Sequence, residues 1–597
     1  MSAMKRLRAK RSEERGVRSE GIASPFSLLI ALASGILMGL TVAPVGAWFL
    51  AWIALAPLWV LVVTTPKHSS LLAPHSLPLL WGIGYHGVAL FWITGIHPMT
   101  WMGVPWLSSL AIALFCWIFI TLWGAALVVG WGVGMKALLN WRIPTLKSLL
   151  PNAKTQKTLC AFARQLLQRR EPHASRLNGG NPRTVLAPQR TGSSLRDKIP
   201  LSLVRLLIGV ALWCGLESLW SAGPLWWSSL SYTQSPHNLP ILHLGQLSGA
   251  SAVTAAIVAV NGLFAEAWIA VVGAHSRAPI QGSRKTSVVF CLLPFAFCLL
   301  LHLLGYSLYS RPLIQSPDTV LKVGIVQGNV PNKIKLYPEG FRKAIEGYTT
   351  GYQTLADRGV DAVLTPEGAL PFRWNDVQRT SFYSAVKERG VVAWLGLFGD
   401  KKGGYTNSIF TLLSNGQIFS RYDKSKLVPI GEYVPFQEIL GGIVSRLSPL
   451  DEHQIAGAPN QLFDTPFGRA IVGICYESAF PERFRYQAAA GGQFILSPSN
   501  DAHYSAAMPA QHHALDIMRA IETDRWAVRA VNTGYSAFVD PHGKTVWISG
   551  HNTYEIHSET IYRRQTKTLY VRWGDWLTPM LMVVAVVVWL VRLVGQV

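Results

Sequence analysis

The stretch Ala470-Ile-Val-Gly-Ile-Cys-Tyr-Glu-Ser-Ala-Phe-Pro-Glu482 decides how the carboxyl-terminal half of this chain is interpreted. Its first five residues form a short apolar run typical of a β-strand, and the polar residues after Cys475 favour a turn into a helix. Such a strand presents the sulfur at its carboxyl end. We expect backbone amides at the helix start to lower the pKa of this thiol and to bind an oxyanion. Taken alone, however, a cysteine with apolar neighbours is more often an inert core residue.

The surrounding residues, 318–572, alternate between short β-rich runs and polar segments compatible with helices. This alternation predicts a layered α/β domain. Helical spacing of apolar residues predicts a helix in 509–530, and Asp540-Pro-His-Gly543 predicts a hairpin turn. The predicted strands lie at 321–326, 362–364, 391–395, 470–474 and 494–496.

A glutamate lies in the stretch Leu364-Thr-Pro-Glu-Gly-Ala-Leu-Pro371, just beyond one of these strands. A carboxylate at Glu367 that is held near a thiol could act as a general base. The alternative, a surface acid in a turn, is favoured if this segment is considered by itself.

A second polar stretch is Tyr422-Asp-Lys-Ser-Lys-Leu-Val-Pro-Ile-Gly-Glu-Tyr-Val-Pro435, in which two prolines and a glycine predict a rigid loop. Lys424 and Glu432 place opposite charges on this loop, and a fixed ammonium can stabilise an oxyanion. Solvated surface charge is the alternative, and Lys426 and Glu438 are further charged residues that fit the spacing equally well.

The chain has six cysteines and none of them forms a Cys-x-x-Cys pair, so neither a zinc site nor a thioredoxin-like motif is indicated. Four lie in apolar runs and Cys160 lies in a basic segment. Cys475 is therefore the only cysteine of the α/β domain. Nothing in the sequence requires a metal or an organic cofactor.

The rest of the chain is typical of a membrane protein. Half of the 597 residues are apolar, only 14% are charged, and the mean hydropathy is +0.26. Apolar runs long enough to cross a bilayer begin near residues 26, 47, 77, 104, 200, 240 and 287, and a last run covers 577–595. We therefore expect a basic cytoplasmic amino terminus (1–25), four spans (26–135), a basic cytoplasmic loop (136–199), three spans (200–308), the extracytoplasmic domain (318–572) and a final span (577–595).

The positive charge is concentrated beside the apolar runs. Seven of the 54 Lys and Arg residues lie in 1–18 and thirteen lie in 136–200, with four acids in the two segments together. This asymmetry follows the positive-inside rule and suits contact with anionic lipid. Basic residues are not interleaved with aromatic residues along a groove, so we expect no nucleic-acid partner. Two acids in or near apolar runs, Glu217 and Glu266, are interpreted as structural rather than as a proton relay.

Taken together and in this order, Glu367, Lys424 and Cys475 resemble the catalytic triad of the nitrilase superfamily. The Lys424 loop, the Cys-Tyr-Glu sequence and a membrane bundle with one closing span further resemble the apolipoprotein N-acyltransferase family. The resemblance runs over nearly the whole chain and includes Val326-Gln-Gly-Asn329 and Ser499-Asn-Asp501.

The resemblance implies a four-layered α-β-β-α domain on the periplasmic side of the bacterial inner membrane. It also implies a ping-pong reaction, in which a phospholipid acylates Cys475 and the thioester is passed to the amine of a diacylglyceryl-cysteine on an apolipoprotein. Glu367 would move the protons, and Lys424 with the backbone amide near Tyr476 would stabilise the oxyanion. Glu432, Tyr476 and Glu477 would support these groups.

Two positions depart from the family pattern. Leu336 and His503 stand where many members carry tryptophan, and both positions would line the substrate cleft, so acyl-chain or head-group preference is open. His503 is interpreted as a polar residue of the cleft rather than as a base.

Two alternatives remain. One is a membrane-anchored hydrolase that uses the same triad with water as acceptor, and the other is a non-catalytic membrane scaffold. The large number of spans speaks against a simple anchored hydrolase, and retention of all three triad residues speaks against a scaffold.

Overall fold

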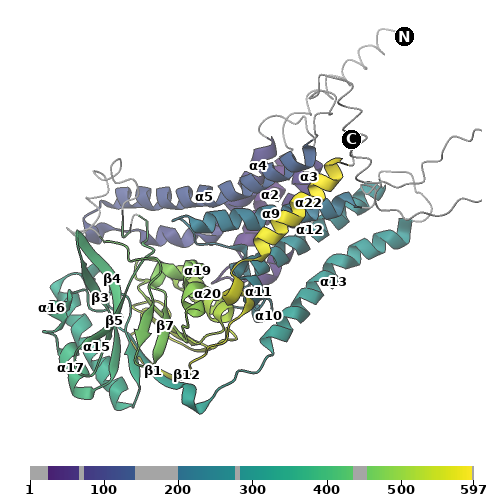
Figure 1. Ribbon diagram of the computed structural model, residues 1–597. Coiled ribbons are helices and arrows are strands. Elements are labelled where there is room, and N and C mark those ends of the chain that lie inside the picture. Colours follow the sequence, from purple (N-terminus) through teal and green to yellow (C-terminus); the bar gives the residue numbers. More distant parts are fainter. Residues whose placement is uncertain are drawn as a thin grey trace, which may run out of the picture.

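The computed structural model describes residues 25–65, 73–141, 199–275, 283–429, 431–433 and 454–594. A bundle of helices packs against one side of an α/β domain (Figure 1). The expectations for the basic amino terminus and for nearly all of the basic loop fall on residues 1–24 and 142–198, outside the described residues.

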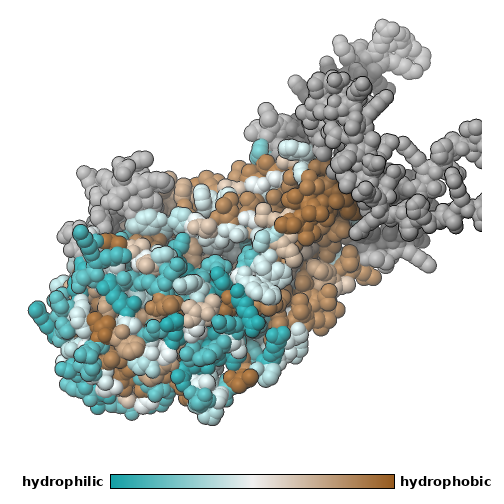
Figure 2. Space-filling model, in the orientation of Figure 1, coloured by the Kyte–Doolittle hydropathy of each residue, from teal (hydrophilic) through white to brown (hydrophobic). Residues whose placement is uncertain are grey.

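Four helices of the bundle are long and apolar enough to cross a membrane, by length and composition, within the ranges described above. These are α5 (Trp106–Asn140), α9 (Leu201–Ala222), α12 (Ala250–His275) and α13 (Ser283–Tyr309). Shorter elements accompany them: α2 (Pro25–Gly39), η1 (Trp48–Trp52), α3 (Ala56–Thr64), α4 (Ala73–Ala89) and α22 (Leu577–Val594). Their outer faces expose large apolar side chains, and the apolar surface is gathered over this part of the molecule (Figure 2).

The apolar run that begins near residue 240 differs from the prediction of one continuous span. It starts with two four-residue helices, α10 (Leu239–Leu242) and α11 (Gly245–Ser248), and the long helix α12 begins only at Ala250. Gly249 separates α11 from α12 with φ of +71°, a conformation that favours glycine and breaks the helix. The number of crossings and the division into domains stay predictions.

The two acids of the bundle have several hydrogen-bond partners. Glu217 accepts from the Leu230 backbone N–H at 2.9 Å and from the Ser229 hydroxyl at 2.8 Å. Glu266 accepts from Trp59 Nε1 at 3.1 Å and pairs with Arg205 at 3.3 Å. These contacts fit the structural role expected for both residues, because buried acids are stable only when they are well paired.

The α/β domain contains two six-stranded sheets with the same sequence of pairings. From one edge to the other, each sheet has one antiparallel pair, two parallel pairs and two antiparallel pairs. The first has the order β12 (Glu555–Tyr562), β1 (Val320–Gln327), β2 (Ala362–Leu364), β3 (Val392–Lys401), β4 (Gly404–Leu412) and β5 (Ile418–Asp423). The second has the order β6 (Phe463–Thr465), β7 (Gly468–Val472), β8 (Ile495–Ser499), β9 (Ala527–Val531), β10 (Ala537–Val539) and β11 (Thr545–Ile548).

The sheets pack face to face and each has a helical layer on its outer face. One apolar core joins the two sheets, with Val323, Leu364 and Trp394 from the first and Val472 and Leu496 from the second. Helices α15 (Pro338–Asp357) and α17 (Ser381–Arg389) share a core with the first sheet. Helices α19 (Pro481–Ala489) and α20 (Ala507–Thr523) share a core with the second sheet and with the bundle. The predicted α-β-β-α sandwich is therefore confirmed.

The segment 509–530 is only partly helical. Helix α20 ends at Thr523, Asp524 adopts a left-handed conformation with φ of 56°, and strand β9 begins at Ala527. A residue in this conformation ends a helix, and here the chain turns directly into the sheet. The hairpin turn at 540–543 was predicted correctly, since it joins the antiparallel strands β10 and β11.

Candidate active site

Cys475 lies just beyond strand β7, at the first residue of the short 3-10 helix η6 (Cys475–Ala479). Its backbone has φ of 52°, a left-handed conformation that is costly for a residue with a side chain. The side chain is only 6% exposed and lies against the core between the two sheets. The sequence placed the sulfur correctly at a strand end, although the helix that follows begins as a single 3-10 turn before α19.

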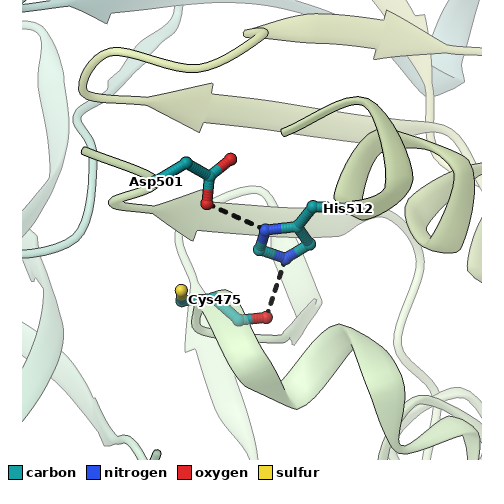
Figure 3. Close-up of side chains that lie close together, drawn as sticks. All are labelled: Cys475, Asp501 and His512. Atoms are coloured by element: carbon teal, nitrogen blue, oxygen red, sulfur yellow. Dashed lines mark hydrogen bonds and ion pairs between the residues drawn. The ribbon is translucent and has the colours of Figure 1, made fainter. Parts of the chain in front are cut away.

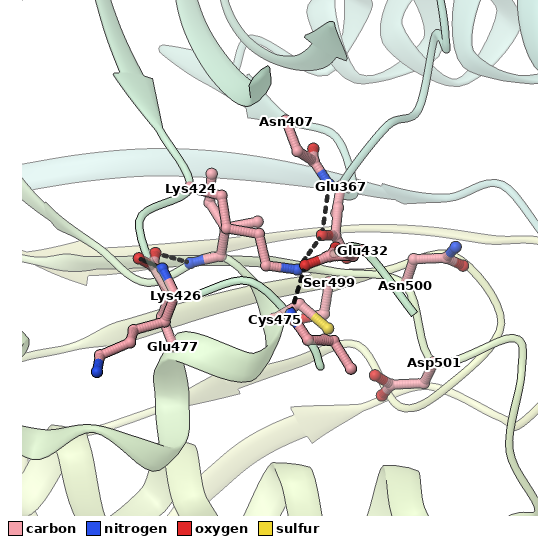
Figure 4. Close-up of polar contacts among 12 residues, drawn as sticks. Glu367, Asn407, Lys424, Lys426, Glu432, Cys475, Glu477, Ser499, Asn500 and Asp501 are labelled. Atoms are coloured by element: carbon pink, nitrogen blue, oxygen red, sulfur yellow. Dashed lines mark hydrogen bonds and ion pairs between the residues drawn. The ribbon is translucent and has the colours of Figure 1, made fainter. Parts of the chain in front are cut away.

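Lys424 follows strand β5, and its ammonium lies between two carboxylates. Its Nζ is 2.7 Å from Glu367 Oε1 and 2.6 Å from Glu432 Oε1 (Figure 4). The amide of Asn407, on strand β4, donates to the same Glu367 oxygen at 2.7 Å. The Val428 backbone N–H donates to the other Glu432 oxygen at 2.8 Å. The structure thus brings Glu367, Lys424 and Glu432 together.

The electrostatics keep the lysine charged and the thiol protonated. Burial alone would lower the pKa of Lys424, but Glu367 and Glu432 outweigh it and hold this pKa well above its usual range. Burial, reinforced by Glu367, raises the pKa of the Cys475 thiol well above its usual range, and Lys424 opposes this only in part. The expectation that helix amides lower the thiol's pKa is therefore wrong. A thiol of this kind needs a base that removes its proton as it reacts.

Tyr476 connects the cysteine segment to the helical bundle. Its hydroxyl lies 2.5 Å from the Pro224 carbonyl and 2.9 Å from the Trp226 carbonyl, and it accepts from the Trp226 N–H at 3.1 Å. Its ring stacks on Trp227 with ring centroids 6.2 Å apart. The side chain therefore anchors the turn that carries Cys475 on the loop after α9.

Glu477 connects the cysteine segment to the lysine loop. Its buried carboxylate accepts from the Ile474 N–H at 2.9 Å, on its own turn. It also accepts from the N–H groups of Ser425 and Lys426 at 2.9 and 3.2 Å. One acid thus fixes the distance between the strand that carries Cys475 and the loop that carries Lys424.

Lys335 is a site residue that sequence reasoning missed. It is the last residue of the short helix α14 (Asn332–Lys335), is 8% exposed, and donates from Nζ to the Glu367 carbonyl at 3.1 Å. Burial lowers the pKa of Lys335 to about 8, although the Glu367 charge opposes this change. No sequence motif marks the residue, because a lysine in a polar turn is ordinarily exposed.

Cys475, Asp501 and His512 offer atoms that lie within 4.8 Å of one another, close enough to suggest a metal site. The side chains are already hydrogen-bonded, however (Figure 3). The His512 ring contacts Asp501 Oδ1 through Nδ1 and the Cys475 carbonyl through Nε2, each at 2.9 Å. Arg529 binds the other Asp501 oxygen at 2.9 Å. Since both ring nitrogens are used, the imidazole has no lone pair left for a metal ion.

A cavity of about 1230 Å³ joins the two halves of the molecule. Its polar end contains Glu367, Lys424 and Cys475, and its apolar end is lined by α5 side chains that include Phe115 and Phe119. In Figure 4 the Cys475 sulfur lies beside the cluster formed by Glu367, Lys424 and Glu432.

Both positions that depart from the family pattern, Leu336 and His503, line this cavity. The His503 ring lies beside the Asn332 amide, with Nδ1 2.7 Å from Asn332 Nδ2. Burial lowers the pKa of His503 to about 4, which makes it a weak proton acceptor near neutral pH and fits a polar cleft residue.

Both halves of the chain, the α/β domain and the helical bundle, match known protein families. Residues 322–569 match the carbon-nitrogen hydrolase family, and residues 34–150 match the apolipoprotein N-acyltransferase N-terminal domain. Apolipoprotein N-acyltransferase of Nostoc sp. is 59% identical over 92% of this chain and 97% of its own length. The protein of the same name from Synechocystis sp. is 43% identical over 93% of this chain and 99% of its own length. With both domains matched and near full-length similarity at this level, the chain belongs to the apolipoprotein N-acyltransferase family.

Proposed function

We propose that the protein transfers a fatty acyl chain from a membrane phospholipid to the amino-terminal amine of a diacylglyceryl-cysteine on an apolipoprotein. The observation that carries this proposal is one continuous cavity, which extends from the buried Cys475 to apolar residues of the long helix α5. An acyl chain that enters from the bilayer can remain in apolar surroundings while its ester reaches the sulfur.

In the first half-reaction, Glu367 accepts the Cys475 proton as the sulfur attacks the carbonyl carbon of the sn-1 ester, for example of phosphatidylethanolamine. The carbonyl electron pair becomes an oxyanion, which the Lys424 ammonium and the Tyr476 backbone N–H stabilise. When the tetrahedral intermediate collapses, the bond to the glycerol oxygen breaks and Glu367 returns its proton to that oxygen. A lysophospholipid leaves and a thioester remains on Cys475.

In the second half-reaction, the free amine of the diacylglyceryl-cysteine attacks the thioester carbonyl. Glu367 takes a proton from the nitrogen, the carbon–sulfur bond breaks, and the proton returns to the departing Cys475 sulfur. Glu432 holds Lys424 against the site, while Tyr476 and Glu477 hold the nucleophile's turn.

We further propose that the protein spans the bacterial inner membrane and that its α/β domain lies on the periplasmic side. Basic residues concentrated in 1–18 and 136–200 support a cytoplasmic location for those segments. The outward apolar faces of the long helices support contact with lipid (Figure 2).

Purified protein in detergent, mixed with phosphatidylethanolamine and a synthetic diacylglyceryl lipopeptide, tests the proposal. We expect an N-acylated lipopeptide and one lysophospholipid for each product molecule. Release of free fatty acid without lipopeptide acylation would instead indicate a hydrolase, and no turnover of either substrate would indicate a scaffold.

A further inference from the structure

A buried histidine contacts the peptide bond that follows the nucleophile. His512, on helix α20, lies 2.9 Å through Nε2 from the Cys475 carbonyl oxygen (Figure 3). In a trans peptide the carbonyl and the next N–H point in opposite directions. The bond to the Cys475 carbonyl therefore sets the direction of the Tyr476 N–H. That N–H belongs to the first turn of η6, where a helix leaves its own amides without partners.

The Cys475 carbonyl defines which nitrogen of the His512 ring donates. A backbone carbonyl can only accept, so Nε2 carries a hydrogen. Asp501, which faces Nδ1 at 2.9 Å, is kept ionised because His512 and Arg529 outweigh the effect of burial and lower its pKa. His512 therefore donates from Nε2 to the Cys475 carbonyl, while Nδ1 lies against the Asp501 carboxylate.

A buried arginine holds the acid that contacts His512. Arg529, on β9, binds Asp501 at 2.9 Å and Asp516 at 2.6 Å, and all four side chains are at most 1% exposed. The Asp501 carboxylate that faces the His512 ring is thus itself held by a buried arginine, which fixes the position of the ring. The neighbouring His513 contacts Thr545 at 3.0 Å, and burial lowers its pKa to about 4, so it adds no charge near neutral pH.

Helix α20 is itself fixed by the helical bundle at the preceding residue. Gln511 accepts from Trp92 Nε1 and Trp227 Nε1, both at 3.0 Å, and donates to the Ala89 carbonyl at 2.8 Å. The Trp227 ring also meets the His512 ring edge to face, with centroids 5.7 Å apart. The position of the histidine is therefore determined by the α/β domain and the bundle together.

We infer that His512 is a positioning residue for the acyl transfer proposed above. It holds the Cys475–Tyr476 peptide in its strained conformation, so that the Tyr476 N–H faces the oxyanion. It does not exchange protons with the substrate. The inference rests on the proposed function, because it assigns His512 a role in that reaction's tetrahedral intermediates.

Two substitutions separate the two contacts of the ring. In His512→Gln the amide nitrogen occupies the place of Nε2 and still reaches the Cys475 carbonyl. In His512→Asn the amide nitrogen occupies the place of Nδ1 and keeps the Asp501 contact, but it cannot reach the carbonyl. His513→Gln is the matched control, because His513 is an adjacent buried histidine that contacts Thr545 rather than Cys475.

Two rates are compared in each variant of the full-length protein. One is acylation of Cys475 by phosphatidylethanolamine, which forms an oxyanion, and the other is alkylation of Cys475 by iodoacetamide, which does not. Loss of one oxyanion donor costs on the order of 100- to 1000-fold in rate. We expect His512→Asn to lose acylation by this factor with alkylation changed less than about threefold. We expect His512→Gln to stay within about tenfold of wild type, and His513→Gln to match wild type.

Equal acylation in wild type and His512→Asn would overturn the inference, and so would a parallel loss of both rates in the Asn and Gln variants. If His512→Asn fails to fold, His512→Gln decides: a folded Gln variant that has lost acylation 100-fold or more contradicts the assigned role, and one that keeps it supports the role. An absence of any acyl adduct in wild type would instead refute the proposed function itself.

Discussion

Replacing Lys424 by methionine removes the cation that lies between the Glu367 and Glu432 carboxylates. The Lys424 side chain is 0% exposed, its partners Glu367 and Glu432 are 6% and 17% exposed, and the contacts are 2.7 and 2.6 Å long. Breaking a buried ion pair by removing one partner costs roughly 3 to 5 kcal/mol, because a charge is left without compensation. We expect Lys424→Met to lower the free energy of unfolding by this amount and to abolish acylation of Cys475.

A second substitution separates the two effects. In Lys424→Met/Glu432→Gln one of the uncompensated carboxylates is gone, so at least half of the lost stability should return. Acylation should not return, because no ammonium faces the oxyanion. Thermal unfolding in detergent measures stability, and intact-mass spectrometry measures the acyl adduct. The exposed Lys402→Met is the control and should behave as wild type.

The reasoning is refuted if Lys424→Met is as stable as wild type, or if the double variant is less stable than the single one. Either result would mean that the carboxylates do not depend on the lysine charge. Recovery of acylation in the double variant would also refute the role of Lys424 as oxyanion stabiliser.

Three further predictions concern the groups around the triad. Lys335→Met should be stabilised relative to wild type by about 3 kcal/mol near pH 7 and by only about 1 kcal/mol at pH 9.5, as followed by thermal unfolding at each pH. The folded protein holds the Lys335 ammonium proton less tightly than the unfolded chain does. Wild type therefore gains stability as the pH rises through the folded pKa of about 8 towards 10.5. A stability difference between the variant and wild type that stays constant with pH would contradict this reasoning. Tyr476→Phe should destabilise by roughly 1 to 3 kcal/mol, because the Trp226 N–H loses its acceptor, whereas the exposed Tyr486→Phe should have no effect in the same measurement. Glu477→Gln should reduce both stability and acylation, since an amide cannot accept from all the N–H groups around it. The exposed Glu388→Gln is the control. An unchanged melting temperature and an unchanged acylation rate in Glu477→Gln would count against the bridging role of Glu477.

Much of the fold could be predicted from local patterns. The strand at 362–364 was predicted with its observed bounds, and the turn at 540–543 was identified from its composition. Both depend on interactions close in the sequence. The end of α20 could not be predicted, because it depends on Asp524 adopting a left-handed conformation without a glycine to signal it. The division of the run near residue 240 depends on the left-handed φ of Gly249, which interrupts the helix.

Glu367, Lys424 and Cys475 could be singled out in the sequence because each stands beside a recognisable strand end or rigid loop. The raised pKa of the Cys475 thiol could not be predicted from the sequence. It follows from burial in the folded domain rather than from the position of Cys475 at a helix start. Lys335 and His512 were missed for the same reason. His512 is 37 residues from Cys475 along the chain, and only the packing of α20 brings its ring to the Cys475 carbonyl.

Peptide mass spectrometry of detergent-purified protein after incubation with phosphatidylethanolamine tests the central claim most directly. The account predicts a fatty-acyl mass on the peptide that contains Cys475. It should be absent in Cys475→Ala and Glu367→Gln, and addition of a diacylglyceryl lipopeptide should discharge it to that peptide's amine. No adduct in wild type, or an adduct that is discharged only to water, would contradict the claim that this site performs acyl transfer through a thioester.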